Sequence, residues 1–285
     1  MGSGKPSKGK KQKRSEDKGG GARKTTSFKN PNRIPLGSNR AKTKKTEAET
    51  DNEKSNSKDI KVHPLLSNHA TASQQLSFFL DRFQSANGLK LSSLELEPIK
   101  DTCMLELSQG LEQDAETLSE HVKAAFGTSW KEVLYEGQIL GGIDPGNPAV
   151  IVISTSAIRS LELLRGLRPL TKECCGAKLF AKHMKVDDQV SLLKGRVNIA
   201  SGTPSRIKKL IDMDALGLSR LALIVLDMHT DAKGYSLFTL PQVSVEFWDL
   251  YKTNFHQRVV QGDLRISLYG PIPIGTKVTT GVPDE

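Results

Sequence analysis

The stretch RVNIASGTPSRIKKLIDMDALGLSRLALIVLDMHTD, residues 196–231, decides the fold class. It contains two short apolar runs, residues 197–200 and residues 221–226, on either side of a polar segment. Apolar runs of about four to eight residues between turn signals are typical of strands that helices cover on both faces. Between the runs, Ser205 follows Pro204 and precedes RIKKLI, where a hydroxyl can cap a new helix. The stretch therefore predicts a strand, a helix and a second strand.

The same pattern extends in both directions along the chain. Further strands are expected at residues 149–154, 177–182 and 264–270, and further helices at residues 113–126, 157–167, 187–194 and 240–255. An earlier helix is expected because Leu76, Phe79, Leu80 and Phe83 recur at helical spacing. In the helix at 157–167, the apolar stripe is expected to be Ile158, Leu161, Leu164 and Leu167. Strands that alternate with helices indicate an α/β fold.

The N-terminal region has a different composition. The chain of 285 residues has a formal net charge of +9, but residues 1–45 hold fifteen lysines and arginines against two acidic residues, a net charge of +13. The remaining residues carry a net charge of −4. Because residues 1–73 are polar and poor in large apolar side chains, we expect a disordered basic tail there and a folded domain at 74–285.

Two basic clusters lie within this tail. They consist of Lys8, Lys10, Lys11, Lys13 and Arg14, and of Arg40, Lys42, Lys44 and Lys45. Clusters of one charge sign favour nuclear import and non-specific contact with RNA. The alternative is a tail that only keeps the protein soluble.

The composition also indicates the cellular compartment. No apolar run approaches the length of a membrane span, and the N-terminus lacks the apolar part of a signal peptide. The cysteines Cys103, Cys174 and Cys175 form no paired framework, which favours a reducing compartment. For Cys174 and Cys175, small half-buried side chains are favoured over a redox or metal-binding role. We expect a protein that is soluble, is not secreted and binds no metal.

Several motifs together resemble known families. GTPSR at 202–206, followed by LIVLD at 223–227, resembles the TPGR and VLDEAD motifs of DEAD-box RNA helicases. With AVIVIS at 149–154, KLFAKHMK at 178–185 and VLDMH at 225–229, the chain is similar to the Cms-type family of nucleolar pre-ribosomal proteins. That family carries a degenerate first lobe of the helicases. The resemblance implies a RecA-like, mostly parallel sheet flanked by helices, with an N-terminal helical extension before it.

The chain departs from the helicase pattern where ATP chemistry needs particular residues. The expected phosphate loop, residues 137–148, reads GQILGGIDPGNP and has no Gly-Lys-Ser/Thr ending. Met228 replaces the glutamate after Asp227, and residues 267–269 read Ser-Leu-Tyr instead of Ser-Ala-Thr. We also expect no second lobe, since the chain ends at Glu285. A protein without enzymatic activity and without a cofactor is the resulting expectation.

The candidate site lies where the parallel strands end, because open α/β sheets bind ligands at that edge. The resemblance assigns an RNA contact to Thr155, which matches the threonine of PTRELA. The turn from Gly202 through Thr203 and Ser205 to Arg206 could hold an RNA phosphate at a helix N-terminus, with Arg206 as a forked donor. Alternatively, the turn only starts a helix and Arg206 pairs with a carboxylate. For Asp227, a structural role as a strand end bonded to nearby backbone is the alternative to chemistry.

Three functions compete at this point. The first, implied by the resemblance, is a non-enzymatic ribosome biogenesis factor of the small-subunit pre-ribosomal particle, which binds pre-ribosomal RNA, assembly proteins or both in the nucleolus. The second is an ATP-dependent RNA helicase with divergent motifs. The third is an α/β enzyme with a small-molecule substrate, for which the sequence offers no nucleophile and base. We favour the first, with no membrane and no small-molecule substrate as partners.

Overall fold

The computed structural model describes residues 1–2, 65–67, 69–136, 144–172 and 175–274. The basic clusters, most of the expected phosphate loop and Cys174 lie outside these residues. The described fold belongs to the compact unit Ile60–Glu285.

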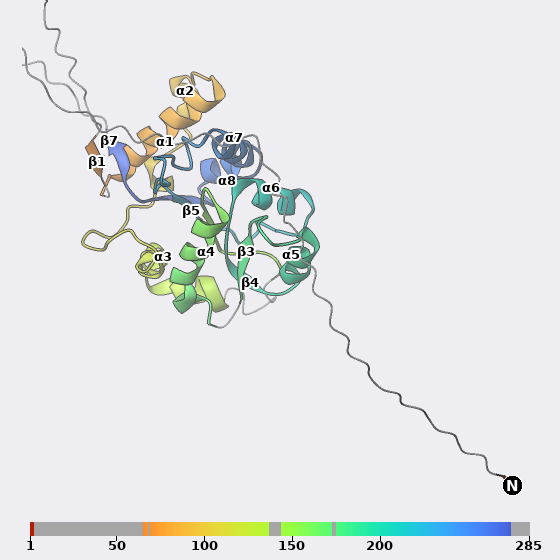
Figure 1. Cartoon of the computed structure of the whole chain (residues 1–285). Helices are drawn as coiled ribbons and strands as arrows, with labels where there is room; N and C mark the ends of the chain where they lie inside the picture. The colour runs from red at the N-terminus through yellow and green to blue at the C-terminus, as the bar shows by residue number, and fades with distance from the viewer. Residues whose placement is uncertain (3–64, 68, 137–143, 173–174, 275–285) are drawn as a thin grey trace, which may run out of the picture. The chain divides into compact units, whose positions relative to one another are not determined.

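A five-stranded sheet forms the centre of this unit (Figure 1). Its strands lie in the order β3-β4-β2-β5-β6, and every neighbouring pair is parallel. The strands are β2 (Val150–Ile153), β3 (Cys175–Leu179), β4 (Val197–Gly202), β5 (Leu223–Asp227) and β6 (Arg265–Tyr269). All residues of β2, β4 and β5 are buried, as continuous apolar strands between two helical layers should be. The expected parallel α/β fold is confirmed.

Alternate residues of β2 face two separate cores. Val150 and Val152 pack with helices α3 (Leu118–Phe126) and α4 (Ala157–Gly166). Ile151 and Ile153 belong to a larger core. That core is formed with α1 (Ala72–Asn87), α5 (Val186–Leu193), α6 (Pro204–Asp212), α7 (Pro241–Leu250) and α8 (His256–Gln261). Figure 1 shows α1, α7 and α8 on one side of β5, with α3 and α4 on the other.

Two helices differ from the sequence prediction. Helix α3 begins at Leu118 and not near Gln113, because the Asp114 carboxylate accepts the amides of Glu116 and Thr117 in a turn before the helix. In α4 the predicted stripe is wrong at Ile158, whose side chain is 68% exposed, while the buried positions include Ser160, Leu163 and Leu164. The α4 face is therefore rotated from the one that apolar spacing indicated.

The beginning and end of the described fold meet in a small ribbon. Strand β1 (Leu65–Ser67) pairs antiparallel with β7 (Ile272–Ile274). Because β1 precedes Gln74, the described fold begins within the range that composition assigned to the tail, and β6 is not the last strand. Short helices also connect the main elements. They are α2 (Ser93–Leu96), η1 (Asp101–Cys103), η2 (Gly127–Ser129), η3 (Glu132–Glu136), η4 (Arg168–Leu170) and η5 (Tyr251–Phe255).

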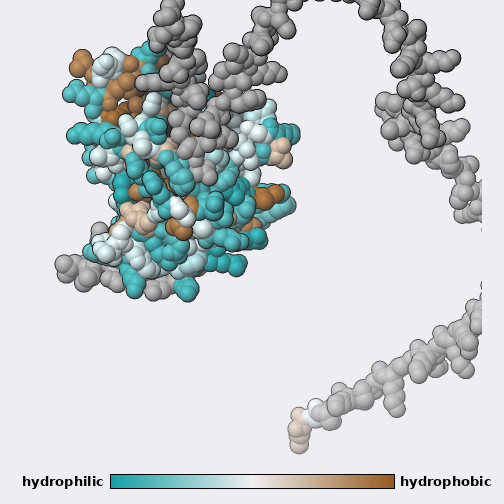
Figure 2. Space-filling view, turned by 90° about the vertical axis from the view of Figure 1, so that its left-hand side faces the viewer, coloured by the Kyte–Doolittle hydropathy of each residue, from teal (hydrophilic) through white to brown (hydrophobic). Residues whose placement is uncertain are grey.

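The surface is consistent with cores that hold most of the apolar side chains. The face in Figure 2 is mainly hydrophilic, with its largest gathering of hydrophobic residues at the upper left and smaller groups elsewhere. None of the described helices has the length and apolar character needed to cross a membrane. Cys103 is buried, whereas Cys175 is exposed at the start of β3, so the expected half-buried state is wrong for Cys175.

Candidate functional site

The strand register brings the predicted site residues to one edge of the sheet. Ile153 at the end of β2 pairs with Gly202 on one side and with Leu226 on the other. Thr155 follows the end of β2, and Asp227 ends β5, so both lie at the edge of the sheet where Gly202 ends β4. The structure thus places Thr155, Gly202 and Asp227 at the edge where they were expected from the sequence.

The turn at Gly202 is shaped by the neighbouring strand. A Cβ added at Gly202 would overlap the carbonyl oxygen of Leu179 in β3, and the Thr203 amide donates to that same oxygen at 3.0 Å. Helix α6 starts at Pro204, with Thr203 as its N-cap residue. Ser205 is exposed inside the first turn, so the expectation that it caps the helix is wrong. Proline has no N–H and a preset φ, which suits the first helical position.

Arg206 is partly engaged within the protein. Its Nη1 donates to the side-chain oxygen of Gln189 at 2.6 Å, and it lies 3.4 Å from the carbonyl oxygen of Met184. Gln189 is 1% exposed, and its Nε2 donates to the carbonyl oxygens of Lys178 and Phe180. The partner of Arg206 is thus a buried amide and not the carboxylate of the alternative interpretation.

Hydroxyl groups fix the start of α4. Ser156, not Thr155, is the N-cap residue, and its hydroxyl accepts the Arg159 amide. The hydroxyls of Ser154 and Ser160 lie 2.7 Å apart, and the Ser201 hydroxyl donates to the Ser160 carbonyl oxygen. Thr155 is half-buried beside this network.

Asp227 lies in a cluster of charged side chains at the end of β5. Its carboxylate is 1% exposed and accepts two hydrogen bonds from the Arg159 guanidinium, from Nε at 2.9 Å and from Nη2 at 3.1 Å. The Nδ1 atom of His229 lies 2.8 Å from Oδ1 of the same carboxylate. Arg159 also pairs with Glu162. Asp227 is therefore bonded to side chains and not, as the structural alternative had it, to nearby backbone.

The pairing with Arg159 determines what Asp227 can bind. Burial lowers the pKa of Arg159, but hydrogen bonds to Asp227 and its charge outweigh burial and raise the pKa above its ordinary value. A magnesium ion needs free carboxylate oxygens, and here both oxygens already have partners on Arg159 or His229. Across the described residues, no group of three or more His, Cys, Asp or Glu side chains could hold a metal.

The residue after Asp227 points into the protein. Met228 is 3% exposed and belongs to the core that α1 and α7 cover, so its position could not present a carboxylate to a reacting water without burying a charge. Tyr269, at the end of β6, is also buried, and its hydroxyl donates to the Asp114 carbonyl oxygen at 2.6 Å. Burial raises the pKa of Tyr269 to about 12.

A second loop–helix connection, separate from the expected phosphate loop at residues 137–148, lies beside β6. Met104 bridges Ile266 in parallel, and the chain then reaches α3 through residues 108–117. In phosphate-binding loops of this topology, backbone amides before the helix bind the phosphate. Here the Asp114 carboxylate takes two of them, from Glu116 at 2.8 Å and from Thr117 at 2.9 Å. The hydrogen bond from Thr117 is the main cause that lowers the pKa of Asp114.

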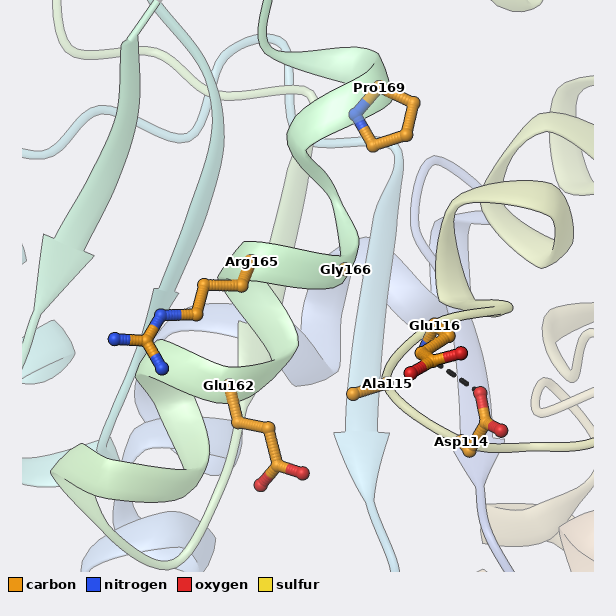
Figure 3. Close-up of a pocket in the computed structure, with 7 residues that line it drawn as sticks. All are labelled: Asp114, Ala115, Glu116, Glu162, Arg165, Gly166 and Pro169. Atoms are coloured by element: carbon orange, nitrogen blue, oxygen red, sulfur yellow. Dashed lines mark hydrogen bonds between the residues drawn. The ribbon is translucent and has the colours of Figure 1, made fainter.

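A hollow of about 540 Å³ borders this loop (Figure 3). Asp114 and Glu116 line it from the loop, and Glu162 lines it from α4. Arg165 also lines the hollow, but its guanidinium points away from Asp114 and Glu116. Three carboxylates beside the loop would repel a polyphosphate. The charge at this end of the edge is therefore unfavourable for the phosphates of a nucleotide.

Sequence reasoning missed the residues that close this end. Arg159 and Asp227 are far apart in the chain, and no motif joined them. The only available signal was a charged residue within the first turn of a helix that follows a buried strand. Gln189 gave no signal, and Tyr269 was marked only as a departure from Ser-Ala-Thr, because the contacts of both depend on backbone atoms of other elements.

Comparisons with known proteins place these observations in a family. A family model described as "CMS1: U3-containing 90S pre-ribosomal complex subunit" matches residues 5–269. Protein CMSS1 of Xenopus laevis is 30% identical over 217 residues, which cover 73% of this chain and 73% of that protein. Protein CMS1 of Chaetomium thermophilum is 30% identical over 192 residues, 64% of this chain and 72% of that protein.

Among solved structures, a DEAD box protein from the hyperthermophile Methanococcus jannaschii is similar. It shares 17% sequence identity and gives a TM-score of 0.33, with 65% of this chain and 49% of that chain covered.

Proposed function

Because the chain belongs to the CMS1 family of U3-containing 90S pre-ribosomal complex subunits, we propose that it is a non-enzymatic factor in ribosome biogenesis. It acts in the small-subunit pre-ribosomal particle in the nucleolus. Its helicase-like domain hydrolyses no ATP and serves as a binding module for pre-ribosomal RNA and assembly proteins. The basic clusters of the tail direct the protein to the nucleus and add RNA contacts that do not depend on sequence.

The observation that carries the loss of ATPase activity is the pairing of Asp227 with Arg159. A helicase-like domain needs this carboxylate to hold magnesium beside the phosphates. Here the carboxylate is held by a guanidinium at 2.9 Å and 3.1 Å and by His229. Groups in such a site act as a unit, so losing even one lowers the rate by orders of magnitude. This supports the binding role over the alternative of an ATP-dependent helicase.

The edge near β4 remains available to RNA. Pro204 lacks an N–H, so the amides of Ser205 and Arg206 are the first donors at the N-terminus of α6. Thr155 and Thr203 are half-buried beside them and carry hydroxyl groups. Helix N-termini favour negative charge, and contacts to phosphates need no particular base. We propose that Thr155 and the turn Gly202, Thr203, Ser205 and Arg206 contact the RNA backbone.

Crosslinking to pre-ribosomal RNA in cells tests this site. The double variant Thr203→Ala, Arg206→Ala should lose a large part of its crosslinks when residues 1–45 are also removed. A matched control is Thr253→Ala, Arg168→Ala, which changes two exposed side chains that line neither hollow of the edge. Melting temperatures of both variants are needed, because Arg206 also bonds to Gln189. Crosslinks that persist in the first variant would show that the turn is scaffold and that the protein joins its particle through protein surfaces.

A further inference from the structure

A second hollow lies at the β3 end of the same edge. Its volume is about 460 Å³, and it opens between the first turn of α4 and the turn after β3. Its lining includes the apolar side chains of Ile158, Leu161, Phe180 and Met184 and the basic side chains of Lys178 and Lys182. No aspartate or glutamate is among the lining residues.

Ile158 is presented to this hollow by a rigid helix start. Its side chain is 68% exposed, although it is one residue before Arg159, which is tied to the buried Asp227. Ser156 caps the same turn, the Ser160 hydroxyl lies 2.7 Å from the hydroxyl of Ser154 just after β2, and the Ser160 carbonyl oxygen accepts the hydroxyl of Ser201 in β4. Because these bonds fix the backbone, the exposure of Ile158 does not result from fraying.

The opposite wall is also held in place. Gln189 binds the carbonyl oxygens of Lys178 and Phe180, on either side of the last residue of β3. The next turn includes His183 with φ of 58°, a left-handed conformation that is uncommon outside glycine. A preformed hollow loses little entropy when a ligand binds.

Charge and shape indicate which ligand suits the hollow. Lys178 and Lys182 are exposed, as is Lys185 in the adjoining turn. Ion pairs within the described part of the chain involve Lys123, Arg159, Lys208 and His229, so these three lysines have no carboxylate partner there. Phe180 is 6% exposed and cannot offer a face for base stacking. An RNA strand would leave Ile158 in water, whereas an apolar side chain would cover it.

We propose that this hollow binds an acidic protein segment that inserts a bulky apolar side chain against Ile158 and places its carboxylates near Lys178 and Lys182. The inference rests on the proposed function and extends it, since it names the chemistry of a protein partner and its site. An apolar anchor surrounded by charged contacts is a common arrangement in peptide recognition.

Fluorescence anisotropy with the full chain tests the proposal. The probe is a short fluorescein-labelled peptide of aspartate and glutamate with leucine and phenylalanine at its centre. A twin peptide has serine at both apolar positions. Since the basic tail attracts both peptides equally, the difference between their affinities measures binding in the hollow. The apolar peptide should bind about tenfold more tightly than its twin, as burial of a large apolar side chain predicts.

Variants then locate the binding. Ile158→Ser should abolish the difference between the peptides, and Lys182→Glu should weaken both. Val245→Ser is the matched control, because Val245 on α7 is 70% exposed and lies outside the hollow. Equal binding of the two peptides, or an equal loss in the Val245 variant, would overturn the proposal. So would oligouridine binding that Ile158→Ser weakens. The crosslinking test of Thr203 and Arg206 does not depend on these results, so the two proposals can fail separately.

Discussion

The two ends of the binding edge of this sheet have opposite properties. At the β5 and β6 end, Asp227 is neutralised by Arg159, and a carboxylate takes the backbone amides before α3. At the β3 and β4 end, Lys178 and Lys182 line a hollow, and Ser205 is exposed in the first turn of α6. We therefore propose that the end where a helicase-like fold would hold a nucleotide is closed and that the other end can bind a polymer.

The Arg159–Asp227 pair links α4 to β5, so we expect it to contribute to stability as well as to closing the site. The Asp227 carboxylate is buried, and the Arg159 guanidinium supplies the positive charge that a buried carboxylate needs.

The largest effect on stability is expected when Arg159, the cation at the closed end, is removed. Arg159→Ala leaves the Asp227 carboxylate buried without its main partner and should lower the free energy of unfolding by about 3 kcal/mol. Urea denaturation followed by circular dichroism measures this change. The double variant Arg159→Met, Asp227→Leu should recover most of the loss, because an apolar pair of similar size carries no buried charge. If Arg159→Ala is as stable as the wild type, the pair does not stabilise this end.

A smaller effect is expected from the tail, and it shows how much of the RNA affinity belongs to the open end. Removing residues 1–45 takes away a net charge of +13. The slope of log K for RNA against log salt should become less steep, since fewer counterions are released on binding. Nuclear accumulation should also be lost. If slope and localisation both persist, the tail only aids solubility and the open end holds all the RNA contacts.

The loss of stability at alkaline pH should depend on the hydroxyl group of Tyr269, which lies at the closed end. Tyr269 has a pKa of about 12 in the folded protein, compared with about 10 in an unfolded chain. The tyrosine hydroxyl is protonated in both states below pH 10, so its contribution is complete there and is lost as pH rises from about 10 to about 12. Tyr269→Phe should make the urea midpoint less sensitive to pH in this window. An unchanged pH dependence would mean that the Tyr269 hydroxyl is not held as described.

The sequence predicted the buried strands well because a parallel sheet requires continuous apolar runs, as at residues 150–153 and 223–227. The meeting of the carboxyl ends of the strands at one edge could be predicted, because all strands of a parallel sheet run in the same direction. The predicted burial of Ile158 was wrong. Apolar spacing alone cannot tell which face of α4 meets the sheet when Ser160 occupies a buried position. The pairing of Arg159 with Asp227 could not be predicted, because it depends on strand order. Ser205 was wrongly predicted to cap α6, because the helix starts at Pro204 and Ser205 lies inside its first turn.

Calorimetric titration of the full chain with ATP and magnesium shows whether the nucleotide end is closed. We expect no binding heat at millimolar ATP and no release of phosphate, because the Asp227 oxygens already have partners and the loop before α3 presents carboxylates. Micromolar binding of ATP, or phosphate release that disappears in Asp227→Ala, would contradict it.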